Sequence, residues 1–161
     1  MATTVAMTEW SAQKTLNFWL NGGTTAVTQP AAKLYIHLML TAPTDDRGTG
    51  YTAVTGVTYT PVQLTPVTVG NPSTLADYQR AFNGSAISIN ITGGTTSLCV
   101  GIVLALTATT PTTSHFLAAA TTDAVVYYGT FASSITLNNG DTLTFNVGTN
   151  AGLTGITIDQ Y

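Results

Sequence analysis

Short hydrophobic runs with the spacing of β-strands occupy most of the chain and are separated by turn residues. Isoleucine stands at every second position in residues 86–92, as Ile87, Ile89 and Ile91. This spacing predicts a strand with one buried face and one polar face. Three further runs alternate in a similar way: residues 57–65, 142–147 and 153–158. A period of two favours β-structure over helix in each of these segments.

Two other runs are almost entirely apolar. They cover residues 33–40 and 98–106, and their lack of alternation predicts strands that are buried on both faces. A further strand is expected at residues 124–131. We expect polar loops at 75–84 and 107–115, with a short turn of helix as the alternative at 75–84.

The one segment with a helical pattern covers residues 8–20. Thr8 is a suitable N-cap, and Glu9 lies in the first turn, where the helix dipole favours an anion. The helix is expected to end at Gly22 and Gly23, because glycine readily adopts the left-handed conformation that closes a helix.

This predicted helix carries more aromatic side chains than a short surface helix needs. One candidate face consists of four residues: Ala12, Leu16, Trp19 and Leu20. Trp10 and Phe18 lie partly off that face. Two interpretations follow, and the sequence leaves both open. Either the helix packs into the main core, or its aromatic side chains contact another subunit.

The order of these segments predicts an all-β protein. We expect an antiparallel β-sandwich, jelly-roll-like, of about 7–9 strands with one short N-terminal helix at about 8–20. The sandwich should cover about residues 31–159 of a single domain, 1–161. Pro61 and Pro66 cannot donate to a β-ladder, so their segment is expected to be an edge strand or a pair broken by a bulge.

Composition narrows the possible functions. Only 7% of the 161 residues are charged and the formal net charge is −3, whereas about 25% of an average soluble domain is charged. Threonine fills much of the difference, with 34 residues. No cluster of lysine and arginine is available to bind nucleic acid. Disorder is excluded too, because disordered chains are poor in aliphatic residues.

Few residues could carry out catalysis. The single cysteine, Cys99, lies within an apolar run, so we interpret it as a small buried hydrophobic residue. His37 also lies inside a predicted strand, with no second ligand at metal-binding spacing. Asp45 and Asp46 beside Arg47 are interpreted as a turn with a local Asp–Arg pair. We therefore expect no catalytic, cofactor or metal site, and no enzymatic activity.

A series of short motifs occurs in order along residues 8–159. These are residues 16–23, 29–40, the loop 41–50, Gly101-Ile-Val-Leu-Ala105, Tyr127-Tyr-Gly129, Asn138–Phe145 and Ile156-Thr-Ile-Asp159. Together they resemble a family of short phage virion proteins that are often labelled tail fibre protein, related to siphovirus capsid cement (decoration) proteins. Two positions depart from the family pattern. Leu104 replaces an acidic residue, and residues 56–61 lack the family's arginine, so the roles of those residues are not transferred.

The resemblance implies a non-enzymatic β-sandwich of the virion. Our first hypothesis is a capsid cement protein that binds the assembled head lattice and stabilises it by mass action. The alternative is a tail fibre or receptor-binding tail component, in which loops such as Asp77–Asn83 contact host glycans. The candidate protein–protein contacts are Trp10, Phe18, Trp19, Pro61 and Pro66.

The expected partners follow from these hypotheses. Under the first hypothesis they are the major capsid protein and copies of the chain itself. These copies are expected to form a homo-oligomer, and we assume a trimer. A host glycan is a partner only under the alternative, and no nucleic acid or membrane is expected under either. The start of the chain lacks a signal-peptide pattern, so we expect synthesis in the host cytoplasm and incorporation into the virion.

Overall fold

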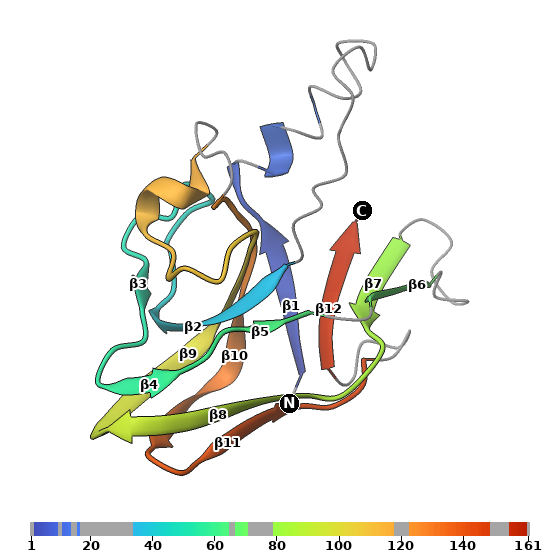
Figure 1. Cartoon of the computed structure of the whole chain (residues 1–161). Helices are drawn as coiled ribbons and strands as arrows, with labels where there is room; N and C mark the ends of the chain where they lie inside the picture. Colours follow the sequence, from blue (N-terminus) through green and yellow to red (C-terminus); the bar gives the residue numbers. More distant parts are fainter. Residues whose placement is uncertain are drawn as a thin grey trace.

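Two β-sheets pack face to face in the computed structural model of the chain (Figure 1). The structure describes residues 2–9, 11–13, 16, 34–64, 67–70, 79–117, 123–148 and 155–160. Within these residues the fold is almost wholly β-structure, with helical residues at 9, 11–13 and 16 and a 3₁₀ helix, η1 (Thr113–Phe116). The prediction of an all-β antiparallel sandwich with a short N-terminal helix is confirmed.

The larger sheet contains nine of the described strands. They are β1 (Ala2–Met7), β2 (Tyr35–Thr41), β3 (Thr52–Ala53), β5 (Val62–Gln63), β6 (Val67–Gly70), β7 (Gln79–Asn83), β9 (Thr96–Ala105), β10 (Val125–Asn138) and β12 (Gly155–Gln160). Their order is β3-β2-β9-β10-β1-β12-β7-β6, with β5 also paired to β2. Strands β1 and β12 run parallel, and the other described ladders are antiparallel.

The smaller sheet has the order β11-β8-β4, where β4 is Val57–Tyr59, β8 is Ile87–Gly94 and β11 is Thr142–Phe145. The alternation predicted for β8 is confirmed, because Ile87, Ile89 and Ile91 are buried while the residues between them are exposed. Strand β11 follows the same rule, with its threonines exposed and Leu143 and Phe145 buried.

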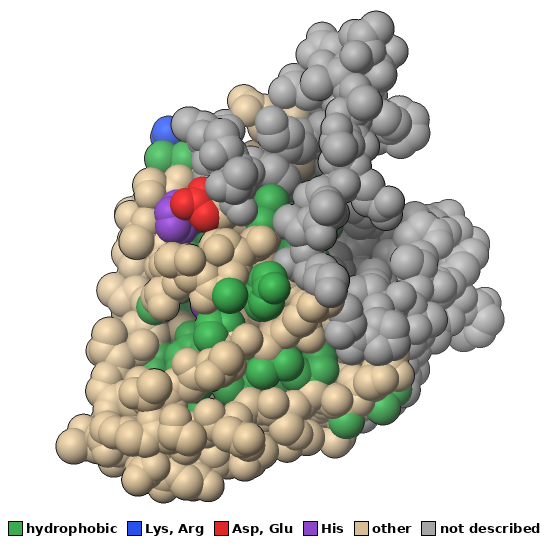
Figure 2. Space-filling view, viewed as in Figure 1, with side chains coloured by type: hydrophobic (Ala, Val, Ile, Leu, Met, Phe, Trp, Pro, Cys, Tyr) green, Lys and Arg blue, Asp and Glu red, His purple; other side chains and the backbone are tan. Residues whose placement is uncertain are grey.

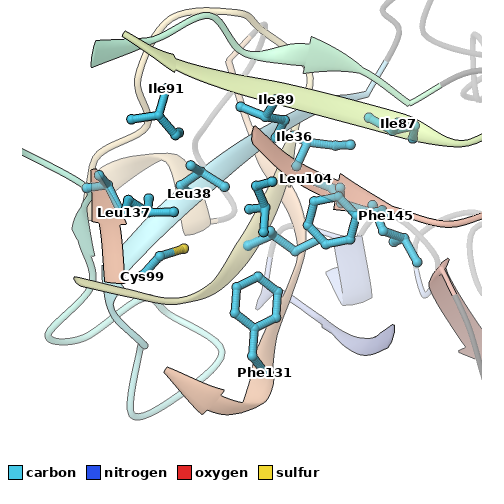
Figure 3. Close-up of a cluster of buried hydrophobic side chains, with 14 of the residues drawn as sticks. Ile36, Leu38, Ile87, Ile89, Ile91, Cys99, Leu104, Phe131, Leu137 and Phe145 are labelled. Carbon is cyan, nitrogen blue, oxygen red and sulfur yellow. The ribbon is translucent and has the colours of Figure 1, made fainter. Parts of the chain in front are cut away.

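The main core lies between the two sheets. Figure 3 shows side chains of β2, β8, β9, β10 and β11 converging there, among them Leu38, Ile89, Leu104 and Phe145. Phe131 of β10 and Phe145 of β11 bring their ring centroids to 6.1 Å, so one aromatic pair links the two sheets. Burying an aliphatic or aromatic side chain of this size stabilises the fold by about 1.5–3 kcal/mol.

A second cluster covers the opposite face of the larger sheet. Phe116 of η1 is fully buried there against Met39, Val103 and Tyr51. The Tyr51 and Phe116 rings lie 4.9 Å apart between centroids. Strand β2 and the second half of β9, Gly101–Ala105, are therefore covered on both faces, as their apolar sequences predict. Leu98, at the start of the run predicted to be buried, is instead 43% exposed, because the first half of β9 has one face in solvent.

The described residues contain twelve strands rather than the expected 7–9. Residues 2–7, to which no element was assigned, form β1, and residues 79–83, expected in a loop or helical turn, form β7. Residues 125–138 form one long strand, with an irregularity between Thr130 and Ile135. Residues 2–7 and 79–83 become strands because neighbouring strands supply their hydrogen bonds, which local propensity does not reveal.

Asn83, at the end of β7, joins three parts of the fold. Its side chain is fully buried, and Nδ2 donates to the carbonyl oxygens of Ser85 at 2.7 Å and Asn146 at 2.8 Å. Its Oδ1 accepts from the backbone N–H of Ile156 at 2.8 Å. A single amide thus ties β7 to the end of β11 and to the start of β12.

Replacing Asn83 by alanine should lower the free energy of unfolding by on the order of 3 kcal/mol, because buried backbone groups then lose their partners. Urea denaturation measures the change. Asn90→Ala is the matched control, since Asn90 is exposed and accepts only a surface bond from Thr142 Oγ1 at 3.1 Å. Equal losses in the two variants would contradict the role assigned to Asn83.

Candidate interaction surface

The structure describes only one of the five predicted contact residues. Pro61 is half-buried between β4 and β5. Trp10, Phe18, Trp19 and Pro66 lie outside the described residues. The candidate interaction surface therefore has three described parts. They are the residues that attach the start of the helix to the sheet, the edge that contains Pro61, and the exposed face of the smaller sheet.

Two buried hydroxyl groups attach the start of the helix to β10. Thr8 Oγ1 donates to the carbonyl oxygen of Val125 at 2.7 Å, and Ser11 Oγ donates to that of Val126 at 2.8 Å. The Ser11 N–H points to Thr8 Oγ1 at 3.4 Å and the Thr8 N–H to Ser11 Oγ at 3.0 Å. Thr8 therefore acts as the predicted N-cap, and the same hydroxyl also fixes the helix to the sheet.

The loop after β2 supports the other side of this helix start. The Glu9 N–H donates to the carbonyl oxygen of Asp46 at 2.9 Å, and Arg47 Nε lies 3.1 Å from Glu9 Oε2. Asp45 instead accepts the backbone N–H groups of Arg47 and Thr49 at 3.1 and 3.0 Å. These bonds, with one from the Thr49 hydroxyl, lower the pKa of Asp45. The expected turn is confirmed, but the side chain of Arg47 pairs with Glu9 rather than with an adjacent aspartate.

One residue of the predicted helix face is exposed. Leu16 is 57% exposed, and Ala12 is half-buried. Leu16 is therefore not packed into the core of its own chain. The aromatic residues on which the two interpretations depend, Trp10, Phe18 and Trp19, lie outside the described residues.

The proline-bearing segment consists of two short edge strands in different sheets. Strand β4 pairs with β8 in the smaller sheet, β5 pairs with β2 in the larger one, and Pro61 lies between them. The Tyr59 hydroxyl accepts the Leu38 N–H at 2.9 Å. This backbone N–H of β2 is therefore bonded to a side chain rather than to a neighbouring strand. The edge strand interrupted at proline, as predicted, is confirmed at Pro61.

The outer face of the smaller sheet carries small uncharged side chains. Its exposed residues are Thr58 on β4, Ser88, Asn90 and Thr92 on β8, and Thr142 and Thr144 on β11. Ser88 and Thr144 hydroxyls lie 3.3 Å apart across the ladder. Figure 2 shows this lower region, over β8 and β11, without acidic or basic side chains. Such a face allows close approach by another neutral surface without desolvating charge.

The candidate glycan-binding loop is only partly available. Of the segment 77–83, residues 79–83 form β7, and the buried Asn83 uses its side chain within the fold. Asn83 therefore cannot contact a glycan, and the first part of the segment lies outside the described residues. Nothing in its sequence signalled burial, because asparagine is more often a surface residue.

Cys99 and His115, two residues with catalytic potential, are buried or paired. Cys99 is fully buried, and burial raises the pKa of its thiol to about 11, so the thiol stays protonated. His115 Nε2 lies 2.8 Å from Asp123 Oδ2, while its Nδ1 accepts the Thr112 N–H at 3.2 Å. Within the described ranges, no three of His, Cys, Asp and Glu are grouped to hold a metal. Nor does a helix in that part of the chain have the length and apolarity to cross a membrane.

His37 is the second buried titratable residue of interest. Its Nε2 donates to the Thr107 carbonyl oxygen at 2.8 Å, whereas Nδ1 is buried without a partner among the described residues. Burial lowers the pKa of His37 below its usual value, although the Thr107 bond opposes this shift. The expected core histidine is confirmed, with one of its two nitrogens satisfied.

Comparison with known protein families gives one match. The family model described as "Podophage GP4 fiber I protein gp80" matches residues 6–151, which is most of the chain. No protein with a curated description matches the chain significantly.

The buried hydrogen bonds of Thr8 should contribute more to the free energy of unfolding than the exposed Arg47–Glu9 pair. Thr8→Val should lower the free energy of unfolding by about 1–2 kcal/mol, because it removes the cap and the bond to Val125. Arg47→Met is the control at the same helix start. Its side chain is 65% exposed, and the loss should stay within about 0.5 kcal/mol. A larger loss for Arg47→Met in urea denaturation would contradict this ranking.

The buried His37 predicts the sign of a pH effect. Its folded-state pKa lies below the unfolded value of 6.5, so below that pH the unfolded chain binds more protons. Stability should be fully present above about pH 6.5 and decline as the pH falls towards the folded-state pKa. His37→Gln should reduce the decline measured by urea denaturation between about pH 7 and 5. An unchanged slope in the variant would exclude His37 as the cause.

Proposed function

Because the chain belongs to the Podophage GP4 fiber I protein gp80 family, it is a phage virion structural protein, and we propose that it forms part of the tail fibre. The observation that carries this proposal is the extent of the family match, which includes β2 through β11. The match favours the fibre alternative over capsid cement, our first hypothesis. The relation to siphovirus cement proteins stays a prediction.

We propose further that the role is structural rather than enzymatic. The buried Cys99 thiol, the buried His37 and the paired His115 support this view, because a nucleophile or general base must reach its substrate. The uncharged outer face of the smaller sheet also suits repeated protein contacts within a fibre. Copies of the chain itself are therefore the partners that we propose first.

The experiment that tests the fibre role removes the protein from the particle. Phage with a nonsense mutation in the gene, grown without suppression, should assemble heads that survive heating and osmotic shock. They should lack complete fibres in electron micrographs and lose adsorption to the host. Supplying the wild-type gene from a plasmid should restore both, which controls for effects on neighbouring genes.

The cement hypothesis predicts the opposite outcome. Particles that lack the protein would then keep their fibres and adsorb normally, while their heads would rupture on heating or osmotic shock. That result would overturn the proposed tail-fibre role and restore the head lattice as the site of action.

A further inference from the structure

Strand β11 is an edge strand of the smaller sheet. It lies at the end of the smaller sheet, and among the described strands it pairs only with β8. Figure 1 shows β11 along the lower margin of the molecule, beside β8. A strand at a sheet edge presents a row of N–H and C=O groups that can pair with another strand.

The ladder register identifies which groups face outward. The Ile91 N–H donates to Asp141 O at 2.8 Å, and the Gly140 N–H donates to Ile91 O at 2.9 Å. Leu143 and Phe145 lie opposite Ile89 and Ile87. Hydrogen-bonded and non-hydrogen-bonded positions alternate along an antiparallel strand. The N–H and C=O groups of Thr142 and Thr144 therefore point away from β8.

The core holds this edge in an extended conformation. Leu143 and Phe145 are 6% and 0% exposed, and Phe145 is linked to β10 through Phe131. The turn before the strand is also fixed, because Asp141 Oδ2 accepts the Asn138 N–H at 2.7 Å. A rigid edge loses little conformational entropy when another strand pairs with it.

The edge also lacks the usual protection against pairing. Natural edge strands commonly carry lysine, proline or a bulge, and residues 142–148 contain no charged residue and no proline. The β11–β8 register, from Thr142 opposite Asn90 to Phe145 opposite Ile87, has no irregularity. The opposite margin of the smaller sheet differs, because Pro61 lies two residues after the end of β4 at Tyr59.

We propose that β11 pairs antiparallel with β11 of a second copy of the chain. This inference rests on the proposed structural role in the fibre, and it identifies the strand through which two copies make contact. A two-fold axis at Leu143 would place Thr142 opposite Thr144 of the second copy. The outward N–H and C=O groups of those residues complement each other in that register. The pairing joins two smaller sheets into one and continues the neutral threonine face across the axis.

The choice of a second copy follows from the chemistry of the edge. Its donors and acceptors are complementary to those of an identical strand running in the opposite direction, and no charge of either sign selects a different partner. Four residues give only a short ladder, so we expect weak association in solution. Many copies held in one assembly would strengthen it through the high effective concentration.

Sedimentation velocity of the full chain over a concentration series tests the pairing. The wild type should form a dimer as concentration rises. Thr144→Pro removes an outward N–H without removing a bond to β8, and should raise the dimer Kd by about tenfold or more. Thr144→Val is the matched control, because it keeps the N–H and should dimerise like the wild type. Circular dichroism checks that the variants are folded.

A cross-linking experiment tests the register independently. Paired residues in such a ladder have Cα atoms about 5.5 Å apart, a distance that a disulfide can span. The double variant Thr142→Cys with Thr144→Cys should therefore give a covalent dimer on mild oxidation. Thr58→Cys on β4 should stay monomeric under the same conditions.

Two results would overturn the inference. One is a wild-type chain that stays monomeric at all concentrations, with no covalent dimer from the double-cysteine variant. The other is a folded Thr144→Pro variant that dimerises as strongly as the wild type. Neither result bears on where the chain lies in the particle, so the proposed fibre role is tested separately by depletion.

Discussion

The burial of the second half of β9, Gly101–Ala105, on both faces is the constraint on which the rest of the structure depends. On one face its side chains join the core between the sheets, and on the other they pack beneath Phe116 and Tyr51. Because β9 also pairs with β2 and β10 along its two edges, removing it would take side chains from both clusters and separate β2 from β10. No charged residue lies in β9, and this agrees with the cost of burying charge.

The composition of the core does not explain the low charge of the chain. The core requires apolar side chains at alternate positions, but the outward positions of β8 and β11 could have carried lysine or glutamate. They carry threonine, serine and asparagine instead, and these residues bond across the ladder at Thr142–Asn90 and Ser88–Thr144. The neutral face is therefore a property of the surface, which supports our proposal that other protein covers it.

Sequence periodicity identified the elements whose environment is regular. It located β2, β8 and β9 because their apolar residues follow simple patterns, and it located the helix start because Thr8 is a recognisable cap. It missed β7 and the buried Asn83, since an amide that bonds to two distant segments, near Asn146 and Ile156, leaves no local pattern. The Arg47–Glu9 pair was missed for the same reason: the two residues are far apart in sequence. Of the predicted contact residues, the structure places Pro61 alone.

We propose that this neutral β-sandwich serves in the fibre and not on the head. Electron microscopy of intact particles, labelled with a gold-conjugated antibody against the chain, tests that claim most directly. The account predicts gold along the fibres at the tail, with heads bare. Gold distributed over the head surface, with fibres unlabelled, would contradict it.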